Sequence, residues 1–240
     1  MKKQSLSVFA MLASTLILIT SCGSNESKTA AQANSAAPAA EQPKTEQAPV
    51  IPTVAIGGIN WMTENLKVTT FSNGEPILEA KADKDWASAA NSKTPAYRMI
   101  DGVCIYNGYA IKDARGIAPA GFKVASSADF ENLIKTLEGE VHIDQKAAAA
   151  MANYTWEIEE WNEGKGDMVM SMVKGKNSVG FNASKGGFCY EAGNLNLGNC
   201  SYWWTSDLKV FDIGYCSQDL GGYTPDNPEG YGFEVRCVKN

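Results

Sequence analysis

The apolar residues of this 240-residue chain are unevenly distributed, which limits what part of it can fold. Residues 1–21, MKKQSLSVFAMLASTLILITS, start with a basic pair and continue with a short apolar run and small residues. This order is typical of a cleaved secretory signal and is too short for a spanning helix. Residues 22–52 follow and are rich in Ala, Gln, Ser and Pro, so they bury too little surface to offset their ordering entropy and are predicted to be a flexible tether. Residues 53–240 are therefore expected to form a single packed domain.

Cys22 follows the apolar run directly, and the preceding Ile19-Thr20-Ser21 resembles a bacterial lipobox. The resemblance implies cleavage before Cys22, lipidation of its sulfur and acylation of the new amino group. An ordinary signal peptide with an incidental Cys is the alternative. Acyl chains hold a protein at a bilayer because each buried CH₂ contributes roughly 0.8 kcal/mol. We therefore expect a lipid-anchored protein of the cell envelope, at the outer membrane, facing either the periplasm or the surface.

The charge balance argues against one class of partner. The chain has 27 acidic and 21 basic residues, a formal net charge of −6. An acidic surface repels the phosphate backbone of nucleic acids. The expected partners are the membrane, reached through the lipid, and a glycan or protein ligand, with no nucleic acid.

Residues for common catalytic chemistry are scarce. The chain has a single His, His142, and no CxxC pair, so neither a zinc cluster nor a Ser-His-Asp triad is predicted. It also lacks a GxSxG elbow, a phosphate-binding glycine loop and an EF-hand loop. Asp226 lies in the turn-like run DNPEG, whose oxygen ligands suit a cation, although a solvated turn is the favoured interpretation. We expect no cofactor, no metal and no enzymatic activity.

The cysteines are first interpreted as disulfides, because an exported chain meets oxidising conditions. Cys189 and Cys200 flank a Gly- and Asn-rich turn, which predicts a bridge between them. Cys216 and Cys237 lie on either side of TPDNPEG, and antiparallel pairing of the flanking runs predicts a second bridge. Cys104 is then left as a free thiol. Other pairings stay open, because strand register can slip.

Short β-rich runs are predicted at both ends of the domain. TVAIGGINWM, broken by Gly57-Gly58, and LKVTTF are typical of strands, and a turn follows at Asn73-Gly74. In the last residues, 233–238, apolar and polar side chains alternate, which predicts a half-buried terminal strand. Strands at both ends around helices indicate an α+β fold.

One clear helix is predicted between these ends. Ser126 can cap it, Asp129 three residues later completes a capping box, and apolar residues follow at the helical period up to Gly139. A shorter helix is expected from Asp144, because QKAAAAMANY is rich in alanine. The domain is thus expected to have one clear and one shorter helix and a loop-rich second half.

That second half concentrates aromatic residues among Asn, Ser and Gly. Rigid rings interleaved with small polar side chains are typical of binding surfaces, because they give large contact areas at low ordering cost. The alternative is that the rings fill the core, as most aromatics do. In a strand the rings of Trp203 and Trp204 would point to opposite faces, so at least one is expected at the surface. The candidate ligand-binding residues are Tyr190, Tyr202, Trp203, Trp204, Tyr215 and Tyr223.

Several pieces of the chain resemble one family. They are INWMTENLKVTTFSNGEPI, IYNGYAI, APAGFKVASSADFENLIKTLEG, VGFNASKGGF, YWWTSD and YGFEVRCVKN, in family order. They are similar to the Fibrobacter succinogenes major paralogous domain, which is common in envelope proteins of the Bacteroidetes and Fibrobacteres. In the first piece Trp61 and Leu66 are then interpreted as core, and Glu64 and Asn65 as making local backbone hydrogen bonds.

The order of elements also resembles the C-type-lectin-like fold, which is shared with formylglycine-generating enzymes. This resemblance implies paired terminal strands, two helices and a long loop-rich second half. Family members often have a Cys where this chain has Ala118, so a family bridge that would use Cys237 lacks its usual partner.

These observations lead to one main functional expectation and two alternatives. The main one is a non-enzymatic, lipid-anchored module, for example an adhesion protein, that binds a glycan or protein through the loops of residues 186–231. The first alternative is an oxidative enzyme related to formylglycine-generating enzymes, with Cys189 and Cys200 as the nearest candidate pair. The second is a passive structural subunit of a surface layer or fibre.

Overall fold

In the computed structural model, the first hairpin turns at the glycine pair that interrupts the run TVAIGGINWM. Strands β1 (Thr53–Ile56) and β2 (Ile59–Met62) pair antiparallel. Gly57 and Gly58 have φ angles of 57° and 78°. Two successive positive φ angles give a turn whose twist matches that of the flanking strands, and glycine adopts them without steric cost.

The structure describes residues 50–140, 150–151, 155–162, 164–198, 200–214, 217–223 and 227–240. The described elements belong to one unit, residues 48–240. Several sequence predictions therefore fall outside the described residues: the signal residues 1–21, lipidated Cys22 with its tether up to residue 49, the start of a helix at Asp144, Tyr215, Cys216, and the turn at Asp226.

The described residues form an α+β fold, as predicted. The helical segments are α1 (Asp83–Asn91), α2 (Gly108–Lys112), α3 (Ser127–Glu140) and the 3₁₀ turn η2 (Pro228–Gly230). Of these, α1 and α2 were not predicted from the sequence. The remaining strands are β3 (Leu78–Glu79), β4 (Ala96–Ile100), β5 (Val103–Asn107), β6 (Phe122–Val124), β7 (Thr155–Asn162), β8 (Asp167–Lys174), β9 (Gly187–Cys189), β10 (Leu195–Leu197), β11 (Cys200–Trp204), β12 (Val210–Gly214), β13 (Ser217–Tyr223), β14 (Gly232–Val235) and β15 (Cys237–Lys239).

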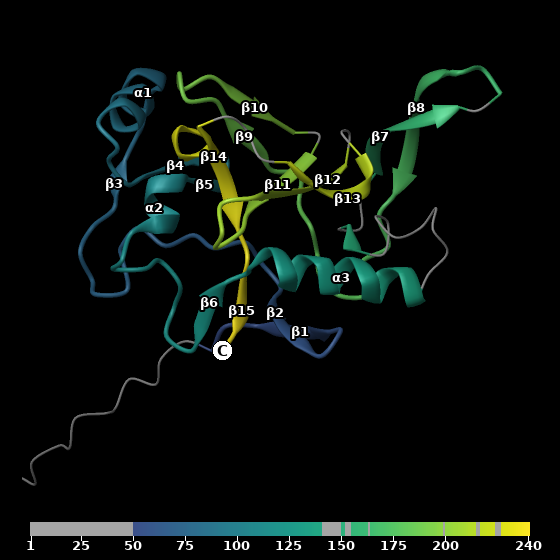
Figure 1. Ribbon diagram of the computed structural model, residues 1–240, viewed down its shortest axis with the longest axis horizontal. Coiled ribbons are helices and arrows are strands. Elements are labelled where there is room, and N and C mark those ends of the chain that lie inside the picture. The colour runs from purple at the N-terminus through teal and green to yellow at the C-terminus, as the bar shows by residue number, and fades with distance from the viewer. Residues whose placement is uncertain are drawn as a thin grey trace, which may run out of the picture. The chain divides into compact units, whose positions relative to one another are not determined.

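Two sheets and one separate hairpin hold the strands (Figure 1). The smaller sheet has the order β1-β2-β15-β6, so the first and last strands of the domain lie together, with Val238 opposite Trp61. The larger sheet has the order β13-β12-β11-β14-β5-β4-β3, and β9, which pairs with β10, also pairs with β14. Among the described strands, β7 and β8 pair only with each other. The expected pairing of terminal strands is confirmed.

Helix α3 begins as the sequence predicts. The Ser126 backbone N–H donates to Asp129 Oδ2 at 2.8 Å, and the Asp129 N–H donates to Ser126 Oγ at 3.3 Å. These two bonds form the predicted capping box and satisfy N–H groups that the helix leaves without internal acceptors. The apolar residues at the helical period face the core, and they are Phe130, Leu133 and Leu137.

Two strand predictions are wrong. The run LKVTTF forms no strand, and only Thr70 within it makes an isolated bridge, to Pro76. The final run is not half-buried, because every residue from 232 to 238 is buried. The physical reason is its position: β14 lies between β11 and β5, and β15 lies between β2 and β6. Neither strand is a sheet edge, and the polar residues at alternate positions are inside.

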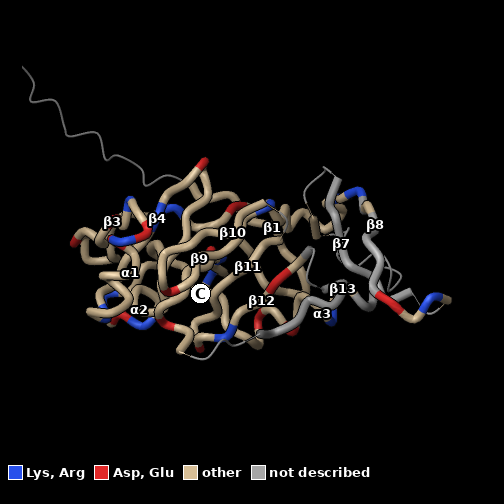
Figure 2. The backbone as a smooth tube through the Cα atoms, turned by 90° about the horizontal axis from the view of Figure 1, so that it is seen from above, with Lys and Arg blue, Asp and Glu red and all other residues tan. Residues whose placement is uncertain are grey.

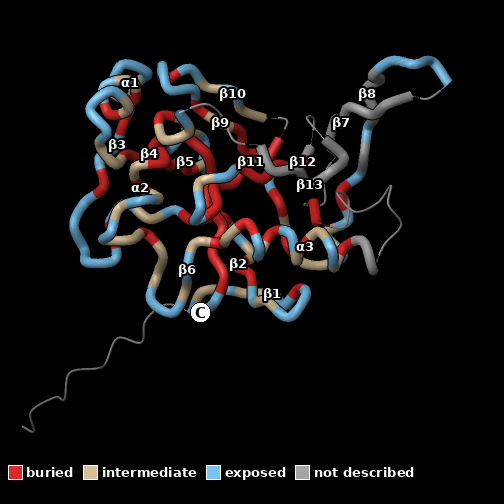
Figure 3. The backbone as a smooth tube through the Cα atoms, viewed as in Figure 1, coloured by how far each residue is buried: buried red, intermediate tan, exposed pale blue. Residues whose placement is uncertain are grey.

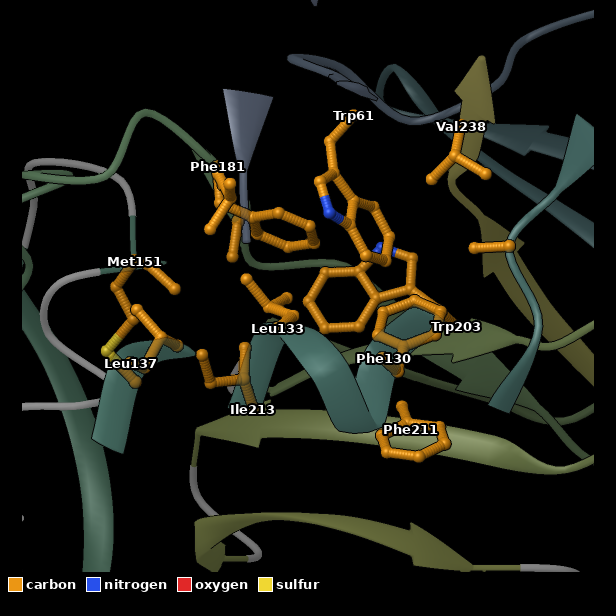
Figure 4. Close-up of a cluster of buried hydrophobic side chains, with 14 residues drawn as sticks. Trp61, Phe130, Leu133, Leu137, Met151, Phe181, Trp203, Phe211, Ile213 and Val238 are labelled. Atoms are coloured by element: carbon orange, nitrogen blue, oxygen red, sulfur yellow. The ribbon is translucent and has the colours of Figure 1, made fainter. Parts of the chain in front are cut away.

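The buried residues concentrate on the central strands and on the inner side of α3 (Figure 3). The Phe130 ring of α3 lies 5.0 Å from the Trp61 ring and 4.8 Å from the Phe211 ring, measured between centroids (Figure 4). The Phe181 ring packs edge-on against Trp61 at 5.3 Å. Trp61 and Leu66 are 0% and 2% exposed, so their prediction as core residues is confirmed.

The predicted Cys189–Cys200 disulfide is wrong, because Cys189 is a buried free thiol. The β9–β10 hairpin turns earlier than the midpoint of the two cysteines, which places Leu195 opposite Cys189. Cys200 lies beyond this hairpin, in β11, and pairs in register with Gly214 of β12. Strand register, which the sequence midpoint could not fix, separates the two cysteines.

The predicted Cys216–Cys237 disulfide is wrong as well. Cys237 is a buried free thiol in the smaller sheet, opposite Val124 of β6. The residues before TPDNPEG pair instead with β12 in the larger sheet, so the two flanking runs do not form a hairpin. Cys104 is a buried free thiol, as predicted.

Candidate functional site

Trp203 and Trp204, two of the candidate ligand-binding residues, are both 0% exposed. They do point to opposite faces of β11. The Trp203 ring stacks on Phe130 at 6.0 Å, and the Trp204 ring packs edge-on against Phe233 at 4.8 Å. The two tryptophans belong to separate core clusters. The expectation that one would reach the surface is wrong, because the core covers both faces of β11.

Tyr190 and Tyr202, in contrast, lie together with two other partly exposed rings in a group that we call the aromatic surface. The Phe188 ring is at its centre, 4.8 Å from Tyr190 and 5.1 Å from Tyr202. Tyr190 is 42% exposed, and Phe188, Tyr202 and Tyr231 are partly exposed. The members of the aromatic surface are Phe188, Tyr190, Tyr202 and Tyr231, and they pack on Phe233, which is buried and belongs to the core.

The rings of the aromatic surface are held by strands and by one anchored turn. Phe188 lies in β9, Tyr202 in β11, and Tyr231 follows η2. Trp86 of α1 donates its indole N–H to the Gly230 carbonyl oxygen at 3.0 Å. The Trp86 ring also covers Gly232, where a Cβ would lie 2.5 Å from a ring carbon. The buried indole therefore fixes the turn from which Tyr231 projects.

A pocket of about 350 Å³, which we call the loop pocket, adjoins this turn. Glu191 and Gly230, next in sequence to Tyr190 and Tyr231, both line it, so it lies beside the aromatic surface. Its lining combines amides, a carboxylate and a phenol, and consists of Ala87, Ala90, Asn91, Tyr109, Glu191, Ala192, Asn227 and Gly230.

The two remaining candidate tyrosines are not placed by the structure. Tyr215 lies outside the described residues. Tyr223 ends β13, where only the backbone is described. Of the six predicted ligand-binding residues, the structure thus brings Tyr190 and Tyr202 together and puts Trp203 and Trp204 in the core.

A second pocket of about 350 Å³, which we call the polar pocket, forms where segments distant in the sequence meet. The loop after β2, the turn between β4 and β5, and the segment before β9 surround it. The β14–β15 segment completes it with two charged residues, Glu234 and Arg236, that are 2% and 0% exposed. The lining residues are Thr63, Glu64, Asn65, Lys67, Asp101, Gly102, Val103, Asn182, Ser184, Lys185, Glu234 and Arg236.

Asn65 connects these two charged residues. Its Nδ2 donates to Glu234 Oε1 at 2.6 Å, and its Oδ1 accepts from Arg236 Nε at 2.7 Å. The same Oδ1 accepts from Trp203 Nε1 at 2.9 Å. Arg236 Nη1 donates to the backbone oxygens of Met62, at 2.8 Å, and Phe181, at 2.7 Å. Asn65 was predicted to make local backbone hydrogen bonds, but its side chain instead links elements from both ends of the domain.

Burial changes the acidity of both charged groups. Desolvation raises the pKa of Glu234 from 4.5 to about 7, against the opposing effects of the Asn65 hydrogen bond and the Arg236 charge. Desolvation also lowers the pKa of Arg236 to about 10, against the effect of Glu234. At neutral pH the Glu234 carboxyl is therefore close to half protonated, and Arg236 remains charged.

A family model described as the Fibrobacter succinogenes major domain matches residues 54–239. The chain belongs to this family. No curated protein and no solved structure matches the chain.

In this Fibrobacter succinogenes major domain, the polar pocket gathers the sequence pieces that carry the family resemblance. Asn65 comes from INWMTENL, residues 182–185 from VGFNASKGGF, and Glu234 and Arg236 from YGFEVRCVKN. Sequence reasoning missed this pocket. The available signal was a pair of charged residues at alternate positions of an otherwise apolar terminal run, a pattern that predicted a half-buried strand instead.

Three buried thiols of this Fibrobacter succinogenes major domain are poorly placed for chemistry. Burial raises the pKa of Cys104 to about 11 and those of Cys189 and Cys237 to about 12. Such thiols stay protonated at neutral pH and are poor nucleophiles and metal ligands. Within the described ranges, no group of three or more His, Cys, Asp and Glu could hold a metal ion. No helix among those residues is long and apolar enough to cross a membrane.

Proposed function

We propose that this protein is a lipid-anchored binding module of the cell envelope that recognises a glycan through the aromatic surface. The observation that carries the proposal is the cluster of partly exposed rings around Phe188, with Tyr190 as its most exposed member. Sugar rings present apolar C–H faces that stack on aromatic rings. Tyrosine suits such a contact because it combines an apolar ring with a polar tip.

The loop pocket supplies the polar groups that a glycan also needs. The hydroxyls of a glycan can donate hydrogen bonds to a protein carboxylate, and they can donate to or accept from side-chain amides. Asn91, Glu191 and Asn227 bring these groups next to the aromatic surface. Lys112 Nζ donates to Glu229 Oε1 at 2.9 Å, which ties α2 to η2 beside the pocket. Positions fixed before binding reduce the entropy lost on association.

The location follows from the N-terminal sequence. We propose that acyl chains on Cys22 hold the protein at the outer membrane and that residues 22–52 act as a tether roughly 30 Å long.

The distribution of charge gives no support to a nucleic-acid ligand. Lys and Arg are interspersed with Asp and Glu along the described backbone (Figure 2). Nucleic-acid-binding proteins instead cluster basic residues on one face. The likeness to the C-type-lectin-like fold is part of the same proposal and rests on the paired terminal strands.

The oxidative-enzyme alternative receives less support. It needs a reactive cysteine pair, and Cys189 is a buried thiol whose pKa burial raises to about 12. Cys200 lies on another strand and is also buried. The fibre-subunit alternative predicts ordered self-association, which sedimentation of the detergent-solubilised protein would detect.

The proposal is tested by binding of the full-length lipidated protein, in detergent micelles, to a glycan array and to an envelope-protein array. Glycan binding is expected, and Tyr190→Ala should weaken it about 5- to 30-fold, the loss of a contact of about 1–2 kcal/mol. Leu78→Ala is the matched control, because Leu78 is similarly exposed, at 48%, but lies in β3 at the end of the larger sheet.

The outcomes separate the alternatives. Binding to envelope proteins alone, weakened by Tyr190→Ala, would replace the glycan with a protein ligand. Equal binding by both variants would exclude the aromatic surface as the contact. Mass spectrometry of the N-terminal peptide tests the anchor independently: a diacyl or triacyl mass on Cys22 supports it, and an unmodified Cys22 refutes it.

A further inference from the structure

The polar pocket contains buried polar atoms that have no hydrogen-bond partner among the described residues. These atoms are Glu234 Oε2 and Arg236 Nη2. Every other hydrogen-bonding atom of the two side chains is used, by Asn65 and by the Met62 and Phe181 carbonyls. Leaving a buried polar group unpaired costs about 1–3 kcal/mol, and more when it is charged. A network with only a structural role would be expected to pair these atoms too.

Gly186 lies directly against the carboxylate, because a Cβ at this position would collide with Glu234 Oε2. Gly186 is not among the glycines with positive φ, so its backbone conformation does not require glycine. The close approach of Glu234 does require it. No side chain larger than that of glycine fits between residue 186 and the unpaired oxygen.

The charges around the polar pocket indicate a neutral ligand. Lys67 and Lys185 line it together with Glu64 and Asp101, and Arg236 is matched by Glu234. Even with Glu234 protonated, the cationic groups exceed the anionic ones by only one, so the charges give no strong preference for an anion or a cation. Hydroxyl and amide groups at Thr63, Asn182 and Ser184 add donors and acceptors.

We infer that the polar pocket binds two adjacent hydroxyls of a sugar or polyol. One hydroxyl donates to Glu234 Oε2, and its neighbour accepts from Arg236 Nη2. A hydroxyl is suited to this position because it can donate or accept, and the Glu234 carboxyl is present in both protonation states near neutral pH. The volume of about 350 Å³ lies within the range of small-molecule sites and accommodates one sugar ring. The inference does not depend on the aromatic surface.

Nuclear magnetic resonance of the full-length protein in detergent micelles provides a direct test. The indole N–H of Trp203 donates to Asn65 Oδ1, so its resonance reports on the network beside the pocket. Glucose, mannose, galactose, mannitol and glycerol are the probes. We expect a saturable shift of this resonance with a dissociation constant in the millimolar range, as for other small neutral ligands. The 1,2-diol of propane should cause a shift, and the 1,3-diol should cause one at least about tenfold smaller.

Two variants test the location. Gly186→Ala forces a methyl group against Glu234 Oε2, and Ser184→Leu enlarges an exposed side chain in the lining of the polar pocket. Both should weaken sugar binding at least about tenfold, and Ser184→Leu serves if Gly186→Ala does not fold. Tyr190→Ala, on the aromatic surface, should leave the Trp203 shift unchanged.

The inference is overturned by any of three results: no saturable shift with any probe, equal shifts with both propanediols, or a shift that survives Ser184→Leu. Sugars alone causing the shift would assign the pocket to a glycan unit, whereas glycerol and mannitol acting equally would assign it to polyols. Because Tyr190→Ala separates the two sites, failure here leaves the proposed function of the aromatic surface standing.

Discussion

Replacement of Glu234 by Gln should change how the stability of the protein depends on pH. Glu234 is 2% exposed and bonded through Oε1 to Asn65. The Gln side chain keeps the Oε1 acceptor. The second carboxyl oxygen is replaced by an amide NH₂ group, which does not change its charge with pH. The substitution therefore removes the proton equilibrium of this position and leaves its size nearly unchanged.

The magnitude follows from the two pKa values of Glu234. Burial raises the folded-state pKa to about 7 from 4.5, and this difference corresponds to about 3 kcal/mol. Because the folded state binds the proton more tightly, the stabilising contribution is complete below about pH 4.5. It is lost as pH rises towards about 7 and is absent above that value. Arg236 and Lys67, the charges that face Glu234, limit the shift by favouring its ionised form.

The assay is urea unfolding of both proteins at intervals between about pH 4.5 and about pH 8. The amide of Gln brings donors without an acceptor, so the variant should be less stable at low pH by about 1–3 kcal/mol. With rising pH the wild type should lose about 3 kcal/mol relative to the variant. The other titrating groups are common to both proteins and cancel in the difference. Parallel curves across this range would refute the assignment of a buried, proton-binding Glu234.

Three further predictions concern the core, the helix cap and the thiols. Phe130→Ala should lower the free energy of unfolding in urea by about 3–5 kcal/mol, because the ring packs against Trp61 and Phe211; a loss below about 1 kcal/mol would contradict this packing. Asp129→Ala should cost about 1 kcal/mol in the same assay by breaking the capping box, whereas an unchanged midpoint would show that the cap contributes nothing. The buried thiols, with raised pKa values, should resist a thiol reagent near pH 8 in the native protein and react once it is unfolded in urea; prompt native labelling, read by peptide mass spectrometry, would show that they are accessible. These thiols are Cys104, Cys189 and Cys237.

Features encoded within a few neighbouring residues could be predicted from the sequence. The cap of α3 depends on Ser126 and Asp129, which are three positions apart, and the strand character of TVAIGGINWM depends on its own residues. The grouping of Tyr190 and Tyr202 was anticipated only as membership of an aromatic region. Their contact through Phe188 depends on β9 and β11 both lying beside β14.

Features that depend on strand register could not be predicted. Alternation in β11 correctly placed Trp203 and Trp204 on opposite faces, but it could not show that both faces are covered. The same limitation explains the wrong disulfides, because a midpoint between two cysteines does not fix where a hairpin turns.

The sequence by itself therefore determined the α+β class, the main helix, the strand character of TVAIGGINWM and the family, all of which rest on local patterns or on motifs in order. Only the tertiary structure decided the polar pocket. Asn65 meets Glu234 and Arg236 across 169 and 171 positions of the chain. Such pairs are set by how β15 docks beside β2 and by the desolvation that follows. The residues adjacent in sequence to Asn65, Glu234 or Arg236 encode neither this docking nor the burial of the three side chains.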